Sequence, residues 1–221
     1  MKSHAEILNY LLAEKTIAIV RLDSGEKLIQ VAEALKEGGI SVIEFTCSTP
    51  GALEMIEVAS ARFGGEVLLG AGTVLDPETA RAAILAGAEF IVTPTVNLDT
   101  IAMCKRYGKS IVSGAMTPTE MLTVWEAGAD LIKVFPARAI GGPDYVRAVL
   151  APLPQLRLVP TGGVSADNAA QYLKAGVVAV AVGGNLVSKK AVENGDWNSI
   201  TAEAQRLVTV IKSAAVQETK L

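Results

Sequence analysis

The feature that most constrains the fold is a repeated unit in which a glycine ends a helix-like stretch and a short apolar run follows at once. It occurs four times, in the runs Gly39–Glu44, Gly87–Val92, Gly128–Lys133 and Gly176–Ala181. Glycine suits the end of a helix because it readily adopts the left-handed conformation found there. The runs are too short for helices and rich in branched residues, so each predicts a buried β-strand.

Further strands are predicted between these runs, at Ile17–Arg21, Val67–Gly70, Ser110–Ser113 and Arg157–Thr161, which gives eight in all. Near-continuous apolar strands indicate a parallel sheet covered by helices. One strand–helix unit per ~28 residues is enough for a (β/α)8 barrel, here with an extra helix at the N-terminus. Because no linker or shift in composition divides the chain, a single barrel domain over residues 1–221 is expected.

A doubly wound open sheet is the competing architecture. Its usual marker, Gly-x-Gly-x-x-Gly after the first strand, is absent, because Arg21–Gly25 occupies that place. Three predicted helices begin with a capping residue before a proline, at Thr49-Pro50, Asp76-Pro77 and Thr117-Pro118. The regular alternation of strands with capped helices favours the barrel.

Charge and hydropathy exclude several classes of protein. The chain has 20 Lys and Arg against 23 Asp and Glu and no basic segment, so no nucleic-acid partner is expected. Mean hydropathy is +0.38, yet the longest weakly polar run, Ala175–Gly184, is about half of the ~20 residues that a spanning helix needs. Glu6 and Glu14 interrupt the apolar N-terminus, so neither a signal peptide nor membrane binding is expected, and the protein is predicted to be cytoplasmic.

The single histidine restricts the chemistry. His4 lies in the predicted terminal helix, where a solvent-facing position is expected. With His4 at the periphery and no other imidazole in the chain, a Ser-His-Asp triad and multi-histidine zinc sites are excluded. Cys47 and Cys104 are too few for a disulfide framework or a metal cluster and are interpreted as packing residues. Any catalysis must use carboxylates, lysines, hydroxyls and main-chain groups.

Two ionisable residues stand inside otherwise apolar strands, Glu44 and Lys133, each five residues after the glycine of its repeat. One such residue would be explained by a buried ion pair or by a side chain that reaches the rim. Two at equivalent places favour a functional site. Burial disfavours the charged form of a lysine, and a neutral amine attacks a ketone to form a Schiff base. Glu44 can move the protons that this chemistry requires, so the pair suggests a lysine-dependent aldolase.

A phosphate site is expected where glycine pairs follow the seventh and eighth predicted strands. These pairs are Gly162-Gly163 and Gly183-Gly184. Paired glycines let main-chain N–H groups approach an anion, and the N-terminus of a short helix beyond each pair would add its dipole. In (β/α)8 barrels the loops after these two strands commonly bind phosphate.

Other rim positions are weaker candidates. Arg21 ends the first strand and either holds a carboxylate through its planar guanidinium or forms a surface ion pair. Thr73, after the third strand, either binds substrate or caps a turn, and Pro94 is expected to shape a wall after the fourth. Two basic pairs are interpreted as solvated surface, Lys105-Arg106 and Lys189-Lys190.

Taken together, the rim motifs resemble those of one enzyme family. They are, in order, Ile43–Thr46, Gly70–Val74, Thr93-Pro94, Leu131–Ala137 and Pro160–Val164. The chain resembles the 2-dehydro-3-deoxy-phosphogluconate / 4-hydroxy-2-oxoglutarate aldolases, class I enzymes on a (β/α)8 barrel. The likeness extends from Ile17 to Val187, and Lys-x-Phe-Pro-Ala followed by Pro-Thr-Gly-Gly is its most specific part.

The resemblance implies a role for each candidate residue. Lys133 would be the Schiff-base lysine and Glu44 the general acid/base. Substrate-binding residues would include Arg21 and Thr73 on the pyruvyl carboxylate, Pro94 and Phe135 along the pocket, and Thr161, Gly162, Gly163, Gly183 and Gly184 on the phosphate. The family also implies a homotrimer that needs no metal and no organic cofactor.

The implied reaction splits 2-dehydro-3-deoxy-6-phosphogluconate into pyruvate and glyceraldehyde 3-phosphate. The galactonate epimer and unphosphorylated 4-hydroxy-2-oxoglutarate, which would give pyruvate and glyoxylate, stay open as substrates. Two departures bear on binding, because Cys47–Thr49 stands where some members carry an arginine and Asn185 where a serine often stands. The alternatives are a metal-free sugar-phosphate epimerase that uses Glu44 as its base, and a barrel that serves as an assembly scaffold.

Overall fold

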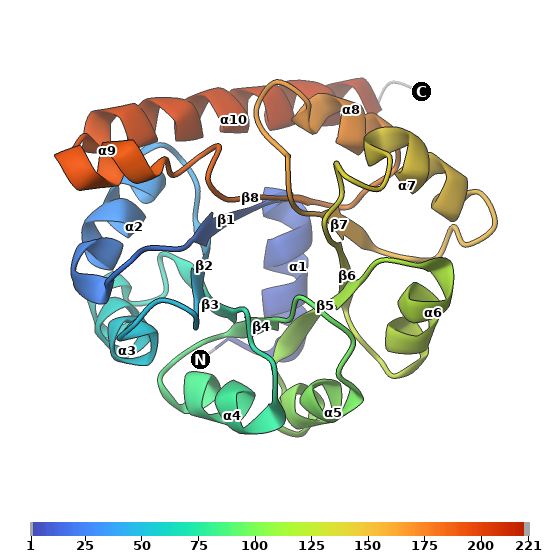
Figure 1. Cartoon of the computed structure of the whole chain (residues 1–221), viewed down its shortest axis with the longest axis horizontal. Helices are drawn as coiled ribbons and strands as arrows, with labels where there is room; N and C mark the ends of the chain where they lie inside the picture. The colour runs from blue at the N-terminus through green and yellow to red at the C-terminus, as the bar shows by residue number, and fades with distance from the viewer. Residues whose placement is uncertain (1, 219–221) are drawn as a thin grey trace.

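The computed structural model describes residues 2–218, and the side chains of residues 2–215. Eight strands form one sheet that curls into a barrel with helices around it (Figure 1). Neighbouring strands are parallel, and a bridge between Thr161 and Ala181 joins the last two. The strands are β1 (Thr16–Val20), β2 (Val42–Thr46), β3 (Leu68–Gly72), β4 (Phe90–Val92), β5 (Ser110–Ala115), β6 (Leu131–Val134), β7 (Leu158–Pro160) and β8 (Val180–Val182). The predicted (β/α)8 barrel is confirmed.

Helix α1 precedes the first strand, and the later helices follow the strands in turn and cover the outside of the barrel. The helices are α1 (His4–Glu14), α2 (Leu28–Glu37), α3 (Ala52–Phe63), α4 (Pro77–Leu85), α5 (Leu98–Arg106), α6 (Pro118–Glu126), α7 (Gly142–Leu150), α8 (Ala169–Lys174), α9 (Lys189–Asn194) and α10 (Trp197–Glu218), with a 3-10 turn η1 (Gly25–Lys27) before α2. Within residues 2–218, no helix combines the length and the apolar character needed to cross a membrane.

Two apolar clusters arise from the alternation of side chains along each strand. On β1, Ile17 and Ile19 belong to a cluster inside the barrel, whereas Ala18 belongs to the cluster between strands and helices. Because successive strand residues point to opposite faces, the same alternation determines the direction in which the two ionisable strand side chains point. The neighbours of Glu44 on β2 and of Lys133 on β6 pack outward, so both charged side chains face the interior.

The extra N-terminal helix, α1, closes one end of this interior. Ile7 and Leu11 of α1 are fully buried and belong to the cluster inside the barrel, and Figure 1 shows α1 lying across the ring of strands. At the start of α1, His4 is exposed, as the sequence predicts, and its Nε2 lies 2.9 Å from Asp130 Oδ1. The helix fills the amino end of the barrel, so the opposite end is left for a site.

Two of the three predicted helix starts are confirmed. Asp76 accepts a hydrogen bond of 2.6 Å from the N–H of Thr79 at the start of α4. Thr117 begins α6 with a capping box, because its hydroxyl accepts from the N–H of Glu120 and the Glu120 carboxylate accepts from the N–H of Thr117. Side-chain oxygens therefore satisfy N–H groups that have no partner within either helix.

The third predicted start, at Thr49-Pro50, is wrong. Helix α3 begins at Ala52, and its N-cap is Gly51, with φ of 75°. The hydroxyl of Thr49 is buried and accepts instead from the N–H of Leu22, at 3.1 Å, in the loop after β1. A contact between two loops thus uses the oxygen that would otherwise have capped the helix.

Candidate active site

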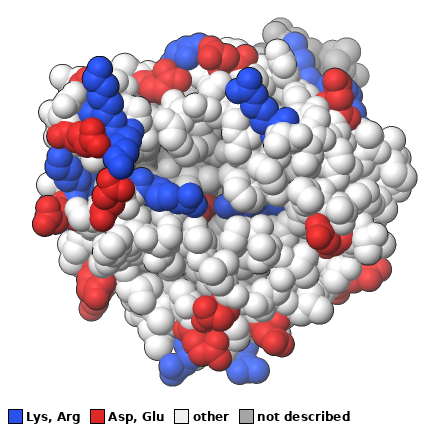
Figure 2. Space-filling model, in the orientation of Figure 1, with Lys and Arg blue, Asp and Glu red and all other residues white. Residues whose placement is uncertain are grey.

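The face that carries the carboxyl ends of the strands is hollowed near its centre, and Lys and Arg side chains reach into the hollow (Figure 2). A cavity of about 530 Å³ lies over the ends of β1, β7 and β8, with Ile19 and Val187 among its apolar walls. Several residues predicted to bind substrate line it, namely Arg21, Phe135, Thr161, Gly162, Gly163, Gly183 and Gly184. The structure therefore brings together residues from four separate loops.

Lys133 lies deeper in the barrel than the lining of this cavity. It pairs in register with Gly114 of β5 and with Val159 of β7, two residues before Thr161. Its side chain is only 5% exposed, and its Nζ lies 5.5 Å from the centre of the Phe135 ring. Among the described residues it forms no hydrogen bond and no ion pair. The amine is thus held in an apolar wall without a partner that would occupy it.

Glu44 is the most deeply buried ionisable residue of the site, at 1% exposed. Neither carboxylate oxygen has a hydrogen-bond partner in the described part of the chain. Burial raises the pKa of this carboxyl above its ordinary value, and the nearby charges of Lys133 and Arg21 offset only part of the increase. Glu44 therefore holds a proton at higher pH than an exposed glutamate, as a proton donor requires.

The glycines of β3 make the room that Glu44 occupies. A Cβ added to Gly72 would overlap the Glu44 carboxyl group, and one added to Gly70 would overlap the ring of Phe90. The Gly-Ala-Gly sequence of β3 thus lets a carboxylate from β2 lie flat against the neighbouring strand. In the sequence these glycines are recognisable only as part of the Gly70–Val74 motif that contains Thr73.

Arg21 and Thr73 meet at the rim, although 52 positions separate them in the sequence. Nη2 of Arg21 donates to Oγ1 of Thr73 over 3.4 Å. Thr73 has a φ of 55°, in the left-handed region that a β-branched residue rarely adopts. Strain of this kind persists where surrounding contacts enforce it and is concentrated at functional sites. The pair presents a guanidinium and a hydroxyl at one place.

Pro94 lies half-buried at the end of β4, where its main chain packs against Gly114 of β5. The hydroxyl of Thr93 fixes this loop, because it accepts from the N–H of Gly114 at 3.0 Å and donates to the carbonyl of Thr95 at 2.8 Å. Pro94 is not part of the lining of the 530 Å³ cavity. Its role in the wall of the pocket stays a prediction.

The two glycine pairs differ in conformation. Gly162 and Gly163 have φ of 92° and 79°, which other residues rarely adopt, whereas Gly183 and Gly184 are not in the left-handed region. Within residues 2–218, no hydrogen bond uses the main-chain N–H groups of these four glycines. The pairs are tied together by Asn185, whose Nδ2 donates to the carbonyl of Val164 over 2.9 Å.

The short helices expected beyond the glycine pairs are present but do not begin at once. Neither glycine pair leads directly into the N-terminus of a helix. Residues 183–187 form a turn, with the N–H groups of Leu186 and Val187 bonded to the carbonyl of Gly183. Helices α8 and α9 begin only at Ala169 and Lys189. Any anion bound here would therefore meet loop N–H groups rather than the end of a helix.

Two basic residues of the cavity were missed from the sequence, Arg138 and Lys189. The interpretation of Lys189 as mere surface was incomplete, because it lines the cavity and also pairs with Asp23 at 2.7 Å. Arg138 comes directly after the Phe-Pro-Ala run that ends the β6 motif. That position at the carboxyl end of a barrel strand is the signal that would have identified it.

Known proteins resemble this chain in sequence and in fold. The sequence model of the aldolase family described as "KDPG and KHG aldolase" matches residues 7–203. A 2-dehydro-3-deoxy-phosphogluconate aldolase of Treponema pallidum is 36% identical over 197 residues, which cover 89% of this chain and 93% of that protein. A 2-dehydro-3-deoxy-6-phosphogalactonate aldolase of Escherichia coli is 34% identical, over 77% of this chain and 83% of that protein.

Among solved structures, a KDPG aldolase from Legionella pneumophila is similar to this chain, with a TM-score of 0.84 and 29% identity. The match covers 93% of this chain and 98% of the other. That structure is described as holding pyruvate captured as a covalent carbinolamine intermediate. The similarity thus extends to nearly the whole barrel of an enzyme that bonds covalently to pyruvate.

Proposed function

This chain belongs to the KDPG and KHG aldolase family and is therefore a lyase, and from that premise we propose that it cleaves a 2-keto-3-deoxy-6-phospho-sugar acid. The preferred substrate is 2-dehydro-3-deoxy-6-phosphogluconate, and the products are pyruvate and glyceraldehyde 3-phosphate. The observation that carries the proposal is the unpartnered amine of Lys133 inside the barrel, near the unpartnered carboxyl of Glu44. The epimerase and scaffold alternatives are set aside, because aldol cleavage is the activity that the family name records.

In the proposed mechanism, Nζ of Lys133 attacks the C2 carbonyl carbon and forms a carbinolamine. Loss of water gives an iminium, which withdraws electrons from the C3–C4 bond. As that bond breaks, its electron pair forms an enamine, and the C4 hydroxyl loses its proton to become the aldehyde that departs. Protonation of the enamine at C3 and hydrolysis of the iminium then release pyruvate and restore the lysine.

Glu44 is proposed to carry the protons of these steps. It would protonate the oxygen that leaves as water, accept the proton of the C4 hydroxyl, and protonate C3 of the enamine. Each transfer requires a carboxyl that exchanges its proton near neutral pH, and burial moves the pKa of Glu44 in that direction. Apolar side chains inside the barrel, among them Val159 beside Lys133, would also exclude water from the enamine, which limits unproductive proton exchange.

Binding residues are proposed at both ends of the substrate. Arg21 and Thr73, which contact each other at the rim, would hold the pyruvyl carboxylate, with Phe135 and Pro94 beside the carbon chain. The phosphate would accept hydrogen bonds from the N–H groups around Gly162, Gly163, Gly183 and Gly184, with the hydroxyl of Thr161 nearby. Support comes from Thr161 itself, because its buried Oγ1 has no partner in the described structure.

The mechanism is tested by trapping pyruvate on the protein with borohydride, followed by intact-mass and peptide mass spectrometry. We expect a reduced pyruvyl adduct on Lys133 in the wild type and none in Lys133→Met, which keeps most of the side-chain volume. Lys109→Met is the matched control, because Lys109 is also buried but stands at the amino end of β5. An adduct that persists in Lys133→Met, or full turnover by that variant, would exclude the proposed role.

Substrate preference is tested separately, by steady-state assay of pyruvate release. The gluconate-derived phosphate, its galactonate epimer and 4-hydroxy-2-oxoglutarate are compared as kcat/KM. We expect the gluconate series to give the highest value. A higher value for either of the others would keep the aldolase mechanism and change the substrate.

A further inference from the structure

Arg138 is one of two basic residues of the cavity, with Lys189, to which the proposed function gives no role. It lines the cavity together with both glycine pairs, and it follows the β6 strand that carries Lys133. Among the described residues, no carboxylate lies within 4.0 Å of its guanidinium. A charge exposed at the mouth of a cavity and not paired within the protein is available to an anionic ligand.

The main chain at Arg138 is held in place by hydrogen bonds to the loop after β7. The N–H of Arg138 donates to the carbonyl of Gly162 at 3.1 Å, and that of Ala137 donates to the carbonyl of Thr161 at 2.8 Å. A Cβ added to Gly163 would lie 2.5 Å from the Cβ and 2.7 Å from the Cδ of Arg138. The side chain therefore lies directly over Gly163, and its position is coupled to that of the glycine N–H groups.

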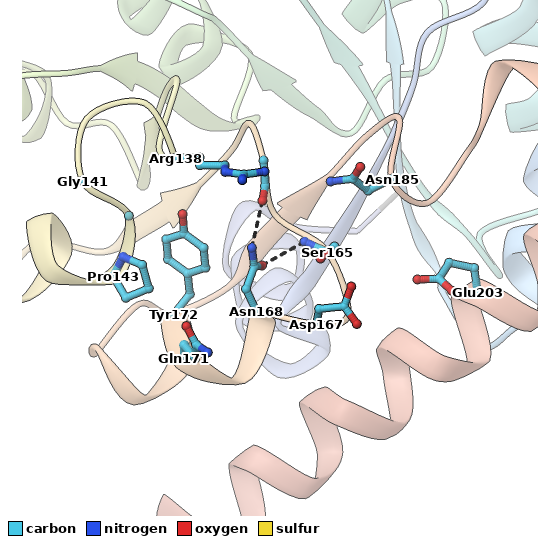
Figure 3. A pocket seen from close by; sticks show the side chains of 12 residues that line it. Arg138, Gly141, Pro143, Ser165, Asp167, Asn168, Gln171, Tyr172, Asn185 and Glu203 are labelled. Atoms are coloured by element: carbon cyan, nitrogen blue, oxygen red, sulfur yellow. Dashed lines mark hydrogen bonds between the residues drawn. The ribbon is translucent and has the colours of Figure 1, made fainter.

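Arg138 also lies at the edge of a second hollow, of about 690 Å³, between the starts of α7 and α8 and the side of α10 (Figure 3). This hollow is lined by the carboxylates of Asp167 and Glu203, and the side chain of Asn168 bonds there to the N–H of Ser165 and the carbonyl of Gly163. Both carboxylates pair with Arg206, and of the four glycines with unused N–H groups only Gly163 lines this hollow, whereas all four line the first cavity. The first cavity is thus where an anion would meet Arg138.

We propose that Arg138 binds the terminal phosphate of the substrate directly and so determines the preference for phosphorylated over unphosphorylated 2-keto acids. The inference rests on the proposed function and adds a side chain to a site otherwise made of main-chain groups. Loop N–H groups orient the phosphate, and the guanidinium supplies the full positive charge that a dianion requires. Lys189, whose ammonium already pairs with Asp23, contributes less.

The experiment measures kcat/KM on two substrates that differ only in the phosphate, 2-dehydro-3-deoxy-6-phosphogluconate and 2-dehydro-3-deoxygluconate. For Arg138→Ala we expect a loss of about tenfold on the phosphorylated substrate, mainly through KM, and a loss below about threefold on the other, since a charge-assisted hydrogen bond is worth about that factor. Arg138→Lys should fall between the wild type and Arg138→Ala, because lysine keeps the charge and loses the planar fork.

Inorganic phosphate provides a readout that needs no turnover of a second substrate. As a competitive inhibitor it should bind about tenfold more weakly to Arg138→Ala than to the wild type. Lys190→Ala is the matched control, because Lys190 is an exposed cation at the start of α9 that lies outside the cavity lining. It removes one positive charge and should change neither quantity.

The outcomes separate the two claims. Equal losses on both substrates, or an unchanged inhibition constant for phosphate in Arg138→Ala, would overturn the role of Arg138 and leave the aldolase intact. A wild-type protein that cleaves neither substrate and forms no pyruvyl adduct would overturn the proposed function itself. A wild type that prefers the unphosphorylated acid would also contradict the inference about Arg138.

Discussion

Glu44 shows how burial sets the protonation state of one residue. Its carboxyl is enclosed between β2 and β3 with no hydrogen-bond donor in the described structure, and the positive charges nearby only partly compensate. Folding therefore favours the protonated form, which raises the pKa above that in the unfolded chain. The same enclosure that suits the residue to its proposed role in proton transfer costs stability whenever the residue is charged.

Replacing Glu44 by glutamine should stabilise the protein at neutral pH. Below about pH 4 the wild-type carboxyl is neutral in both folded and unfolded chains, so the variant gains little there. As the pH rises past the unfolded pKa and then through the raised folded pKa, the wild type loses stability and Glu44→Gln does not. Urea unfolding from pH 4 to pH 8 measures the difference, with exposed Glu57→Gln as control. A constant difference across this range would contradict the prediction.

Replacing Thr73 should relieve backbone strain and weaken substrate binding. Its left-handed φ of 55° costs a β-branched residue about 1 kcal/mol or more relative to glycine. We expect Thr73→Gly to raise the free energy of unfolding by about 1 kcal/mol and to raise KM about tenfold, because the hydroxyl is lost. Thr73→Ser keeps the hydroxyl and should keep KM. Denaturant unfolding and pyruvate release measure the two effects, and an unaltered KM in Thr73→Gly would exclude a binding role.

Strand β3 supports the site because two of its residues are glycines, which have no side chain. Side chains at Gly70 and Gly72 would point into the barrel, where Phe90 and Glu44 already fill the space. On the other side of the barrel, Asn185 bonds to the carbonyl of Val164 and ties the loops after β7 and β8 together. One element makes room for the carboxyl of Glu44, and a pair of loops is held at a fixed spacing where the phosphate site is proposed.

A double-mutant cycle should reveal the packing of Glu44 on Gly72. Gly72→Ala adds a methyl group where the carboxyl lies, and we expect it to lower the free energy of unfolding by about 1–3 kcal/mol. In Glu44→Ala the space is empty, so adding Gly72→Ala there should cost far less. Urea unfolding of the two single variants and the double variant gives the coupling energy. Additive effects would show that the two residues do not compete for the same space.

For the molecule as a whole, apolar side chains at one part of the rim point to self-association. Leu75, Leu98 and Met116 are 56%, 48% and 43% exposed, and they lie at the entrances to α4, α5 and α6. The side chain of Asn97 bonds to the carbonyl of Leu75 and so joins two of these loops. Adjacent exposed apolar side chains commonly mark an interface between proteins, which fits the homotrimer that the family resemblance implies.

Light scattering on the purified protein should therefore give a mass of about three times the 23.0 kDa of one chain. Leu98→Glu places a charge in the proposed interface and should shift the mass towards that of a monomer. Leu85→Glu is the control, because Leu85 is 63% exposed but lies at the far end of α4. A monomeric wild type, or a Leu98→Glu variant with unchanged mass, would contradict this interface.

Much of this protein was determined by local sequence patterns. Short apolar runs predicted all eight strands, four of them after helix-ending glycines, and alternation along β2 and β6 turned Glu44 and Lys133 inward, because each depends only on residues near in the chain. Tertiary structure decided the start of α3, where the Thr49 hydroxyl bonds to Leu22, and the approach of Arg138 to Gly163. These contacts join residues far apart in sequence, and closure of the barrel alone determines which loops become neighbours.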